Sequence, residues 1–424
     1  MERPTQLQKA PAYRFVAFLL MLLPYILTYG GIQIIASFGT EIMESFSVEE
    51  GNLSLLSSLG TFAKAVIALA AGGFMARFGG KRIVLFGLGT MALSGLLYLI
   101  PTESFALLCL FRLVQGIGAG ITSACLMSLV CAWFPRHERA TAQGVMICFF
   151  GVSISIVTVY AFLCRRAGFA WNFSTALWLF VGSAVLFLLI AFFYHDIRAK
   201  YGVNSIDEAL GTEEESAAAD GTDHAVKPSN WSEALRSPAF WISSMALFFY
   251  GACSYGVGFV MPLFFRYCGF DGAEATSIMS IGTLSSAIFA LLGGVISDRV
   301  FHSRRSEVTS ISYGGAVILF VVTALVGRSA SAAVLTMVYF LAYGMMNLCA
   351  GPAWCLPAEV VAPSFASQNM GSSVMFSGIG GFVMMNVIGL VIEHGNALIG
   401  LLLLIGCMLL VTLGGLALRR GYRA

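Results

Sequence analysis

Long apolar stretches recur along the whole chain, and they constrain its fold more than any other feature. A bilayer core about 30 Å thick requires roughly 20 mostly apolar residues for each helix that crosses it. Hydrophobic residues make up 58% of the 424 positions and charged residues only 11%. We therefore predict an all-α membrane protein with twelve transmembrane helices in two pseudosymmetric six-helix bundles. The predicted spans are 15–37, 53–76, 83–101, 105–131, 141–163, 172–195, 239–263, 275–297, 309–327, 331–355, 367–392 and 396–418.

A polar segment separates the sixth apolar stretch from the seventh. It contains the acidic run from Glu213 to Asp220 and no apolar stretch that could cross a membrane. This composition is typical of a solvated linker, and a short helix is expected from Trp231 to Leu235. We predict an N-terminal bundle over residues 1–195, a cytoplasmic linker over 196–238 and a C-terminal bundle over 239–424.

Lysine and arginine residues gather in alternate loops, which indicates the orientation of the chain. They lie at Arg3, Lys9, Arg14, Arg77, Lys81, Arg82, Arg136, Arg139, Arg198, Lys200, Lys227, Arg236, Arg299, Arg304, Arg305, Arg419, Arg420 and Arg423. The opposite loops carry Glu41, Glu44, Glu49, Glu50 and Glu103, with Arg165, Arg166, Arg266 and Arg328 as minor exceptions. Because basic loops remain in the cytoplasm, both termini are predicted to be cytoplasmic.

Charge and composition disfavour several functional classes. The net charge is only +2 and the charges are scattered, whereas a nucleic-acid surface needs a dense basic face. The ten cysteines mostly lie in apolar stretches without a Cys-x-x-Cys pair, so we expect apolar packing and neither disulfides nor a metal site. An intramembrane enzyme would need clustered His, Asp, Glu or Ser, and the five histidines lie in or near loops. We predict no catalytic residues and no cofactor.

A short motif ends the second span of each half. It reads Gly72-x-x-x-Ala76-Arg77 in the first half and Gly294-x-x-x-Asp298-Arg299 in the second. Such a repeat indicates pseudosymmetric halves with a binding site near the midplane, which is the architecture of alternating access. We interpret Gly72, Arg77, Asp298 and Arg299 as a gating and structural motif.

Two motifs give the chain a resemblance to the major facilitator superfamily over nearly its whole length. The segment from Gly72 to Arg82 resembles that family's Gly-x-x-x-Asp-Arg-x-Gly-Arg-Arg loop, and Arg112 to Gly120 resembles its Arg-x-x-x-Gly-x-Gly motif. The resemblance implies a transporter fold and a monomer. Ala76 replaces the loop's Asp, so the resemblance predicts the family's charge contact only in the C-terminal half, at Asp298.

A narrower similarity links the chain to the monocarboxylate and oxalate:formate antiporter branch of this family. It rests on Trp133-Phe134-Pro135 and on the segment from Ala234 to Trp241. That branch binds a carboxylate through an Arg in the eighth span, where this chain has Ala290, so the substrate chemistry is not carried over. The Gly-Pro pair of drug-proton antiporters is absent between Gly144 and Tyr160, which disfavours multidrug efflux.

Two ionisable side chains, Lys64 and Arg112, lie well inside the predicted spans. An ionised group at bilayer depth is costly, so by default it faces a cavity and marks function. Lys64 shares a helical face with small residues and should point inward, either toward substrate or toward backbone carbonyls that it caps. Arg112 could bind an anionic substrate, although in the resembling family this position often bonds backbone and neighbouring helices.

Aromatic and amide side chains form stripes on three predicted helices. Tyr25, Tyr29 and Gln33 recur every four residues on the first span, so they share one face. The tenth span carries Tyr339, Tyr343, Asn347 and Trp354, and the seventh carries Tyr250, Ser254 and Tyr255. These helices line the central cavity in the resembling family, which favours substrate binding by the stripes over interhelical hydrogen bonding or an interfacial aromatic belt.

The expected cargo follows from which charges are present. No Asp or Glu lies in the central part of a predicted span, so a proton relay through an embedded carboxylate is poorly supported. A positively charged cavity favours a small organic anion, in particular a carboxylate, moved by antiport, by symport or by facilitated diffusion. The alternatives are a carrier of a neutral or zwitterionic metabolite, with Lys64 structural, and a membrane sensor that binds solute without moving it. The compact loops and the resemblance favour the bacterial inner membrane.

Overall fold

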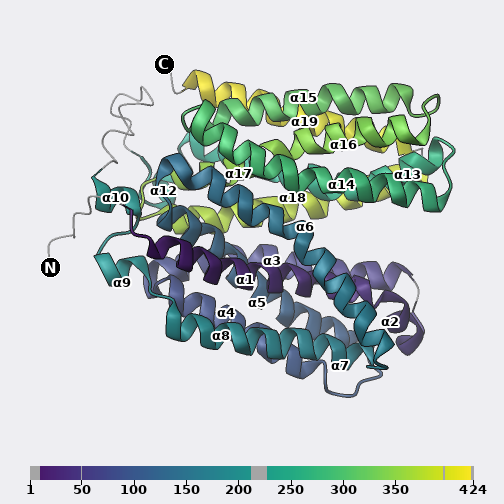
Figure 1. The fold of residues 1–424 in the computed structure, drawn as a ribbon, viewed down its shortest axis with the longest axis horizontal. Helices are drawn as coiled ribbons and strands as arrows, with labels where there is room; N and C mark the ends of the chain where they lie inside the picture. Colours follow the sequence, from purple (N-terminus) through teal and green to yellow (C-terminus); the bar gives the residue numbers. More distant parts are fainter. Residues whose placement is uncertain (1–9, 49, 212–226, 395–396, 422–424) are drawn as a thin grey trace. The chain divides into compact units, whose positions relative to one another are not determined.

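The structure is a computed structural model, and it describes residues 10–48, 50–211, 227–394 and 397–421. These residues form helices and their connections, with no β-strand among them (Figure 1). The helices are α1 (Tyr13–Ser37), α2 (Gly39–Phe46), α3 (Glu50–Phe78), α4 (Gly80–Leu97), α5 (Phe105–Trp133), α6 (Arg136–Arg166), α7 (Trp171–Ala176), η1 (Leu177–Val181), α8 (Gly182–Phe193), α9 (Ile197–Tyr201), α10 (Ile206–Leu210), α12 (Trp231–Ala234), α13 (Pro238–Tyr267), α14 (Gly272–Val295), η2 (Ile296–Val300), α15 (Arg305–Val326), α16 (Ala332–Leu348), α17 (Ala350–Glu359), α18 (Ala366–His394) and α19 (Ala397–Gly421). The elements η1 and η2 are single π-helical turns between α-helices.

Twelve helical segments in the described part of the chain are long and apolar enough to cross a membrane. The predicted fold class, an all-α membrane protein with twelve spans, is therefore confirmed. The ends of several spans differ from the prediction by a few residues. The fifth was expected over 141–163, whereas α6 extends over Arg136–Arg166, because polar residues can continue a helix beyond the hydrocarbon core.

The chain divides into two compact units. Unit 1 comprises Met1–Trp133, Val152–Leu210 and Ser367–Met375, and unit 2 comprises Phe134–Gly151, Gly211–Ala366 and Phe376–Ala424. Each unit therefore includes a segment from the other half of the sequence: the first part of α18 belongs to unit 1, and the first part of α6 belongs to unit 2. The predicted bundles over 1–195 and 239–424 stay a prediction.

Close helix packing in each unit depends on glycine. In unit 1, a Cβ atom added to Gly120 of α5 would lie 2.4 Å from the carbonyl oxygen of Lys64 in α3. In unit 2, a Cβ atom on Gly293 of α14 would lie 1.6 Å from the carbonyl oxygen of Leu348 in α16. Membrane helices approach closely through small residues because lipid supplies no hydrophobic force between them. The contact at Gly120 matters for the site, because it fixes the backbone that carries Lys64.

The predicted linker contains several ordered elements. Ile197, Val203 and Ile206, in and between α9 and α10, are buried within unit 1. The short helix expected near Trp231 is present as α12. The acidic run from Glu213 to Asp220 lies outside the described residues.

One ion pair of unit 1 joins α2 to the end of α6. The Arg165 guanidinium donates to Glu41 Oε2 at 3.0 Å and to the carbonyl oxygen of Ser37 at 2.6 Å. This contact lowers the pKa of the Glu41 carboxyl group, chiefly because the hydrogen bond from Arg165 favours the ionised form. The pair therefore stabilises the fold at pH values above the unfolded-state pKa of Glu, about 4.3.

We expect Glu41→Gln to lower the midpoint of thermal unfolding at neutral pH. The folded-state pKa is depressed, so the contribution of Glu41 is lost as pH falls through that value. The gap between wild type and variant should thus narrow as the pH falls below about 4.3 and disappear below the depressed folded-state pKa. Scanning fluorimetry of the detergent-purified protein measures it, with Glu44→Gln as the control for loss of an exposed carboxylate. A gap that persists at low pH would show that Glu41 acts by packing alone.

Candidate functional site

The structure places Lys64 against two tyrosines of α1 inside unit 1. Lys64 is 6% exposed, and its Nζ lies 4.1 Å from the centroid of the Tyr29 ring. The Tyr25 and Tyr29 rings are 4.5 Å apart between centroids. A cation over an aromatic face gains about 2 kcal/mol or more when both are desolvated. Lys64, Tyr29 and Tyr25 thus form a single cationic and aromatic cluster, here called the Lys64 cluster.

The predicted stripe on α1 is only partly assembled in this cluster. Tyr25 is buried, whereas Tyr29 and Gln33 are each partly exposed. Tyr29 therefore contacts Lys64 and still keeps part of its surface exposed. Gln33 lies one helical turn beyond Tyr29, on the same face of α1.

Arg112 holds the backbone of α1 and lies within the protein interior. It is 1% exposed, and its Nη2 donates to the carbonyl oxygen of Ile32 at 2.7 Å. Its Nη1 donates to Gln115 Oε1 at 2.8 Å and to the carbonyl oxygen of Gly31 at 3.4 Å. The fork geometry of guanidinium suits such simultaneous contacts. Arg112 thus fixes the part of α1 that follows Tyr29.

Two further residues complete this network, and the sequence analysis did not identify them. Gln115 donates from Nε2 to the carbonyl oxygen of Gly31 at 2.6 Å. Tyr98, which directly follows α4, donates its hydroxyl hydrogen to Gln115 Oε1 at 3.2 Å. The three-residue spacing of Arg112 and Gln115 on one helix was a usable signal, because residues at this spacing share a helix face.

We expect Arg112→Lys to destabilise the protein although it conserves the charge. A single ammonium cannot reproduce the forked contacts to α1, and each unpaired buried group costs about 1–3 kcal/mol. The variant should show a lower unfolding midpoint and reduced solute binding. Arg166→Lys, at an exposed position, is the matched control and should change little. A normal midpoint in Arg112→Lys would refute the positioning role.

Unit 2 contains a second aromatic group, formed by Tyr250 of α13 and Trp354 of α17. Their ring centroids are 6.2 Å apart and the planes meet at 85°, an edge-to-face arrangement that aromatic pairs prefer. Both side chains are largely buried. This pair brings together one residue from each of the two predicted stripes in this unit.

The remaining predicted aromatic residues of unit 2 have different surroundings. Tyr339 is fully buried, and its ring packs edge-on against Phe265 and stacks on Tyr343. Asn347 donates from its side-chain amide to the carbonyl oxygen of Tyr343 at 2.9 Å. The Tyr255 ring lies beside Gly381 of α18. These contacts are helix packing, although Tyr255 and Tyr343 are each partly exposed.

A break between α16 and α17 orients Trp354. Pro352 has no N–H group, so the carbonyl oxygen of Leu348 lacks its usual helical donor. At the break, Cys349 donates its backbone N–H to Ser312 Oγ of α15 at 3.0 Å. The break between α16 and α17 therefore has a local cause in the sequence, at Pro352, and a partner in α15.

Asp298 of the repeated motif belongs to a buried charge network in unit 2. Its Oδ2 accepts hydrogen bonds from the backbone N–H and the hydroxyl group of Thr141, each at 2.7 Å. Its other oxygen accepts from Arg305. Arg305 also contacts Glu359, with Nε and Oε1 3.3 Å apart. Asp298 thus joins η2 to the first part of α6, through partners that had not been paired with it from the sequence.

Two arginines of α6 also belong to this network. Arg136 and Arg139 lie 3.8 Å and 3.9 Å from carboxylate oxygens of Glu359. The network therefore connects α6, η2, α15 and α17. Its arginines occur in loops and helix ends that the sequence analysis used only for orientation.

The other motif residues occupy different environments. Gly72 is buried in unit 1, and a Cβ atom there would lie 2.4 Å from the carbonyl oxygen of Ser367 in α18. Arg77 and Arg299 are exposed. Ala76 occupies the position of the family's loop Asp. At the start of α4, the backbone N–H of Lys81 donates a hydrogen bond to Asp196 at 3.3 Å.

We expect Arg305→Gln to destabilise unit 2 strongly. Removing one partner of a buried ion pair costs about 3–5 kcal/mol, because the remaining charges stay buried without compensation. Arg304→Gln is the control, since the neighbouring Arg304 is exposed and contacts Glu307 at 3.7 Å. Thermal unfolding and detergent size-exclusion profiles should separate the two variants. Equal midpoints would contradict the structural importance of the network.

Comparison with known proteins agrees with the twelve-span transporter architecture. The sequence profile of the Major Facilitator Superfamily matches residues 21–385. The chain belongs to this superfamily of membrane transporters. The fold and the family are those of transporters, which implies a small-molecule substrate and a position in the lipid bilayer.

Individual relatives are distant. The probable sulfoacetate transporter of Cupriavidus necator is 23% identical over 368 residues, which cover 83% of this chain and 81% of the relative. Multidrug resistance protein 2 of Bacillus subtilis is 22% identical over 336 residues, or 78% of each chain. The solved structure of the proton:xylose symporter has a TM-score of 0.73 at 14% identity and covers 96% of this chain and 95% of that one. This last likeness shows the fold alone.

Proposed function

We propose that the protein is a secondary transporter that moves a small organic anion, in particular a carboxylate, by alternating access. The observation that carries the proposal is Lys64, a cation that is 6% exposed in the middle of α3 and lies over the ring of Tyr29. An ionised side chain at this depth costs free energy, so such residues occur mainly where they serve binding or transport. The distant similarity to a probable sulfoacetate transporter is consistent with an anionic cargo.

In this proposal Lys64 supplies the charge and the tyrosines supply shape and hydrogen bonds. Tyr29, Tyr25 and Gln33 form the binding face of unit 1. Arg112 positions this face through its hydrogen bonds to the backbone of α1. Tyr250, Tyr255, Tyr343, Asn347 and Trp354 are the binding residues proposed for unit 2. Gly72, Arg77, Asp298 and Arg299 belong to the gating and structural motif.

The mode of coupling follows from the same charges. The predicted spans carry no central Asp or Glu, so we favour exchange of anions, or symport with a proton carried by the substrate or by Lys64.

The proposal includes a monomer in the bacterial inner membrane with both termini in the cytoplasm, no catalytic activity and no cofactor. Orientation rests on the distribution of Lys and Arg.

The second candidate is a carrier of a neutral or zwitterionic metabolite. The observation that favours it is the Lys64–Tyr29 contact itself, since a cation already placed over a ring can be a structural element. The similarity to a multidrug resistance protein also leaves room for uncharged cargo. A sensor that binds solute without transport is the third possibility.

We expect carboxylates, and not neutral metabolites, to raise the unfolding midpoint of the wild type. A ligand at about 100 times its dissociation constant stabilises by roughly 2.7 kcal/mol. Lys64→Gln should lose this response. Lys200→Gln should retain it, because Lys200 also lies over a tyrosine ring, 4.4 Å from the centroid of Tyr13, but in the linker helix α9.

Flux into proteoliposomes completes the test. Carboxylate uptake that requires Lys64 supports the anion carrier. A response to neutral compounds, or an unchanged response in Lys64→Gln, supports the second candidate. Binding without flux in the wild type would identify a sensor.

A further inference from the structure

The segment from Lys227 to Trp241, which leads into α13, presents large apolar side chains on the surface of unit 2. Trp231 is 36% exposed, Leu235 is 51% exposed and Trp241 is 41% exposed. Lys227 is exposed at the start of the segment. The set of Lys227, Trp231, Leu235, Arg236 and Trp241 is here called the pre-α13 surface.

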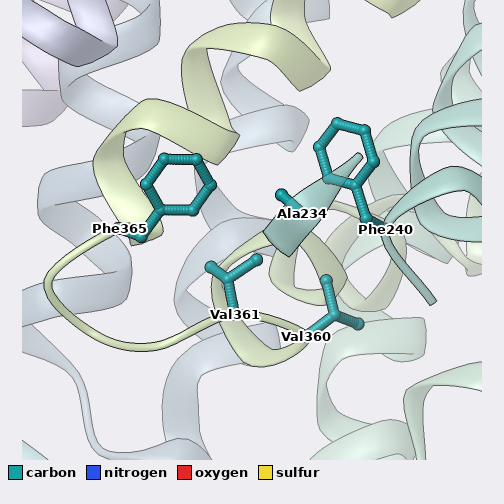
Figure 2. Close-up of a cluster of buried hydrophobic side chains, with 5 residues drawn as sticks. All are labelled: Ala234, Phe240, Val360, Val361 and Phe365. Carbon is teal, nitrogen blue, oxygen red and sulfur yellow. The ribbon is translucent and has the colours of Figure 1, made fainter. Parts of the chain in front are cut away.

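The pre-α13 surface stands on a rigid base. Ala234, Phe240, Val360, Val361 and Phe365 form a buried hydrophobic cluster, and Figure 2 shows the side chain of Ala234 between those of Phe365 and Phe240. The Trp231 ring packs edge-on against Phe365, with centroids 5.0 Å apart. The exposed part of Trp231 is therefore the outer side of an anchored ring, with little conformational freedom left to lose on binding.

A hydrogen bond fixes the side chain of Trp241 on this surface. Trp241 Nε1 donates to the carbonyl oxygen of Leu235 at 2.8 Å, which holds the two residues together. The Trp241 ring also packs against Phe376 of α18, with centroids 6.2 Å apart. The indole N–H is thus satisfied while a large part of the ring remains exposed.

The charge of the pre-α13 surface is basic. Arg236 is exposed and has no ion pair among the residues that the structure describes. The nearby Glu233 carboxylate is used within α12, where it accepts hydrogen bonds from Ser229 and from the side chain of Asn230. Glu233 keeps its negative charge, so the segment from Lys227 to Trp241 has two positive charges and one negative charge.

The position of these side chains identifies the partner. Pro238 begins the seventh candidate span, so Trp241 lies within the first turn of a membrane helix and the rest of the surface lies just before it. Tryptophan and leucine beside basic residues are the side chains that enter the interface of an anionic bilayer. We propose that the pre-α13 surface is an interfacial anchor that binds anionic phospholipid headgroups where the linker enters α13.

Nanodiscs test the proposal with the full-length chain. The protein is labelled with 5-fluorotryptophan, and its ¹⁹F signals are assigned by their loss in Trp231→Phe and Trp241→Phe. One sample contains lipid with a spin label near the headgroup, and another contains a water-soluble paramagnetic agent. We expect the lipid label to broaden both signals more than the soluble agent does. Stronger broadening by the soluble agent would overturn the proposal and would indicate a water-exposed surface open to a soluble protein.

The second arm tests the preference for anionic lipid. Replacing part of the phosphatidylcholine by phosphatidylglycerol should shift the Trp231 and Trp241 signals in the wild type. The shift should be lost in the Lys227→Gln, Arg236→Gln double variant and retained in Arg304→Gln, which removes an exposed arginine elsewhere in unit 2. A shift that survives in the double variant, or no shift in the wild type, would overturn the anionic preference. Neither arm requires transport or solute binding.

Discussion

The cost of leaving a polar group unpaired away from water governs both units of this protein. Backbone groups in hydrocarbon are satisfied within helices, but a guanidinium needs several acceptors in one place. Arg112 finds them in the carbonyl oxygens of Gly31 and Ile32 and in Gln115. Arg305 finds them in Asp298, Ser297 and Glu359. In each case the arginine fixes the relative positions of neighbouring helices.

This requirement gives the two buried arginines different consequences. Arg112 stabilises α1 immediately after Tyr29, so it supports the Lys64 cluster although its own bonds go to backbone and Gln115. Arg305 links α15 to η2 and α17, and the same carboxylates connect to α6 through Thr141 and Arg136. The same guanidinium chemistry thus fixes the backbone of α1 in one unit and joins η2, α15 and α17 in the other.

The aromatic residues show why a periodic pattern alone does not define a binding face. Tyr25, Tyr29 and Gln33 share a face of α1 because of helical geometry, and Tyr29 meets Lys64 as a consequence. Tyr339 has the same spacing relative to Tyr343, yet it is buried against Phe265. Whether a tyrosine faces a cavity or a neighbouring helix depends on the residues packed opposite it.

The sequence by itself determined the twelve spans and the polar break between the sixth and the seventh, and it singled out Lys64 as a candidate binding residue, because hydrocarbon thickness and the cost of burying charge act on local composition. The tertiary structure decided which groups pair. Gln115, Tyr98, Arg305 and Glu359 acquired roles only when helices far apart in sequence came together. Such pairs form only where several side chains lie within hydrogen-bonding distance of one another. Helix packing decides where this happens, and neither the composition nor the hydrophobic periodicity of the sequence specifies that packing.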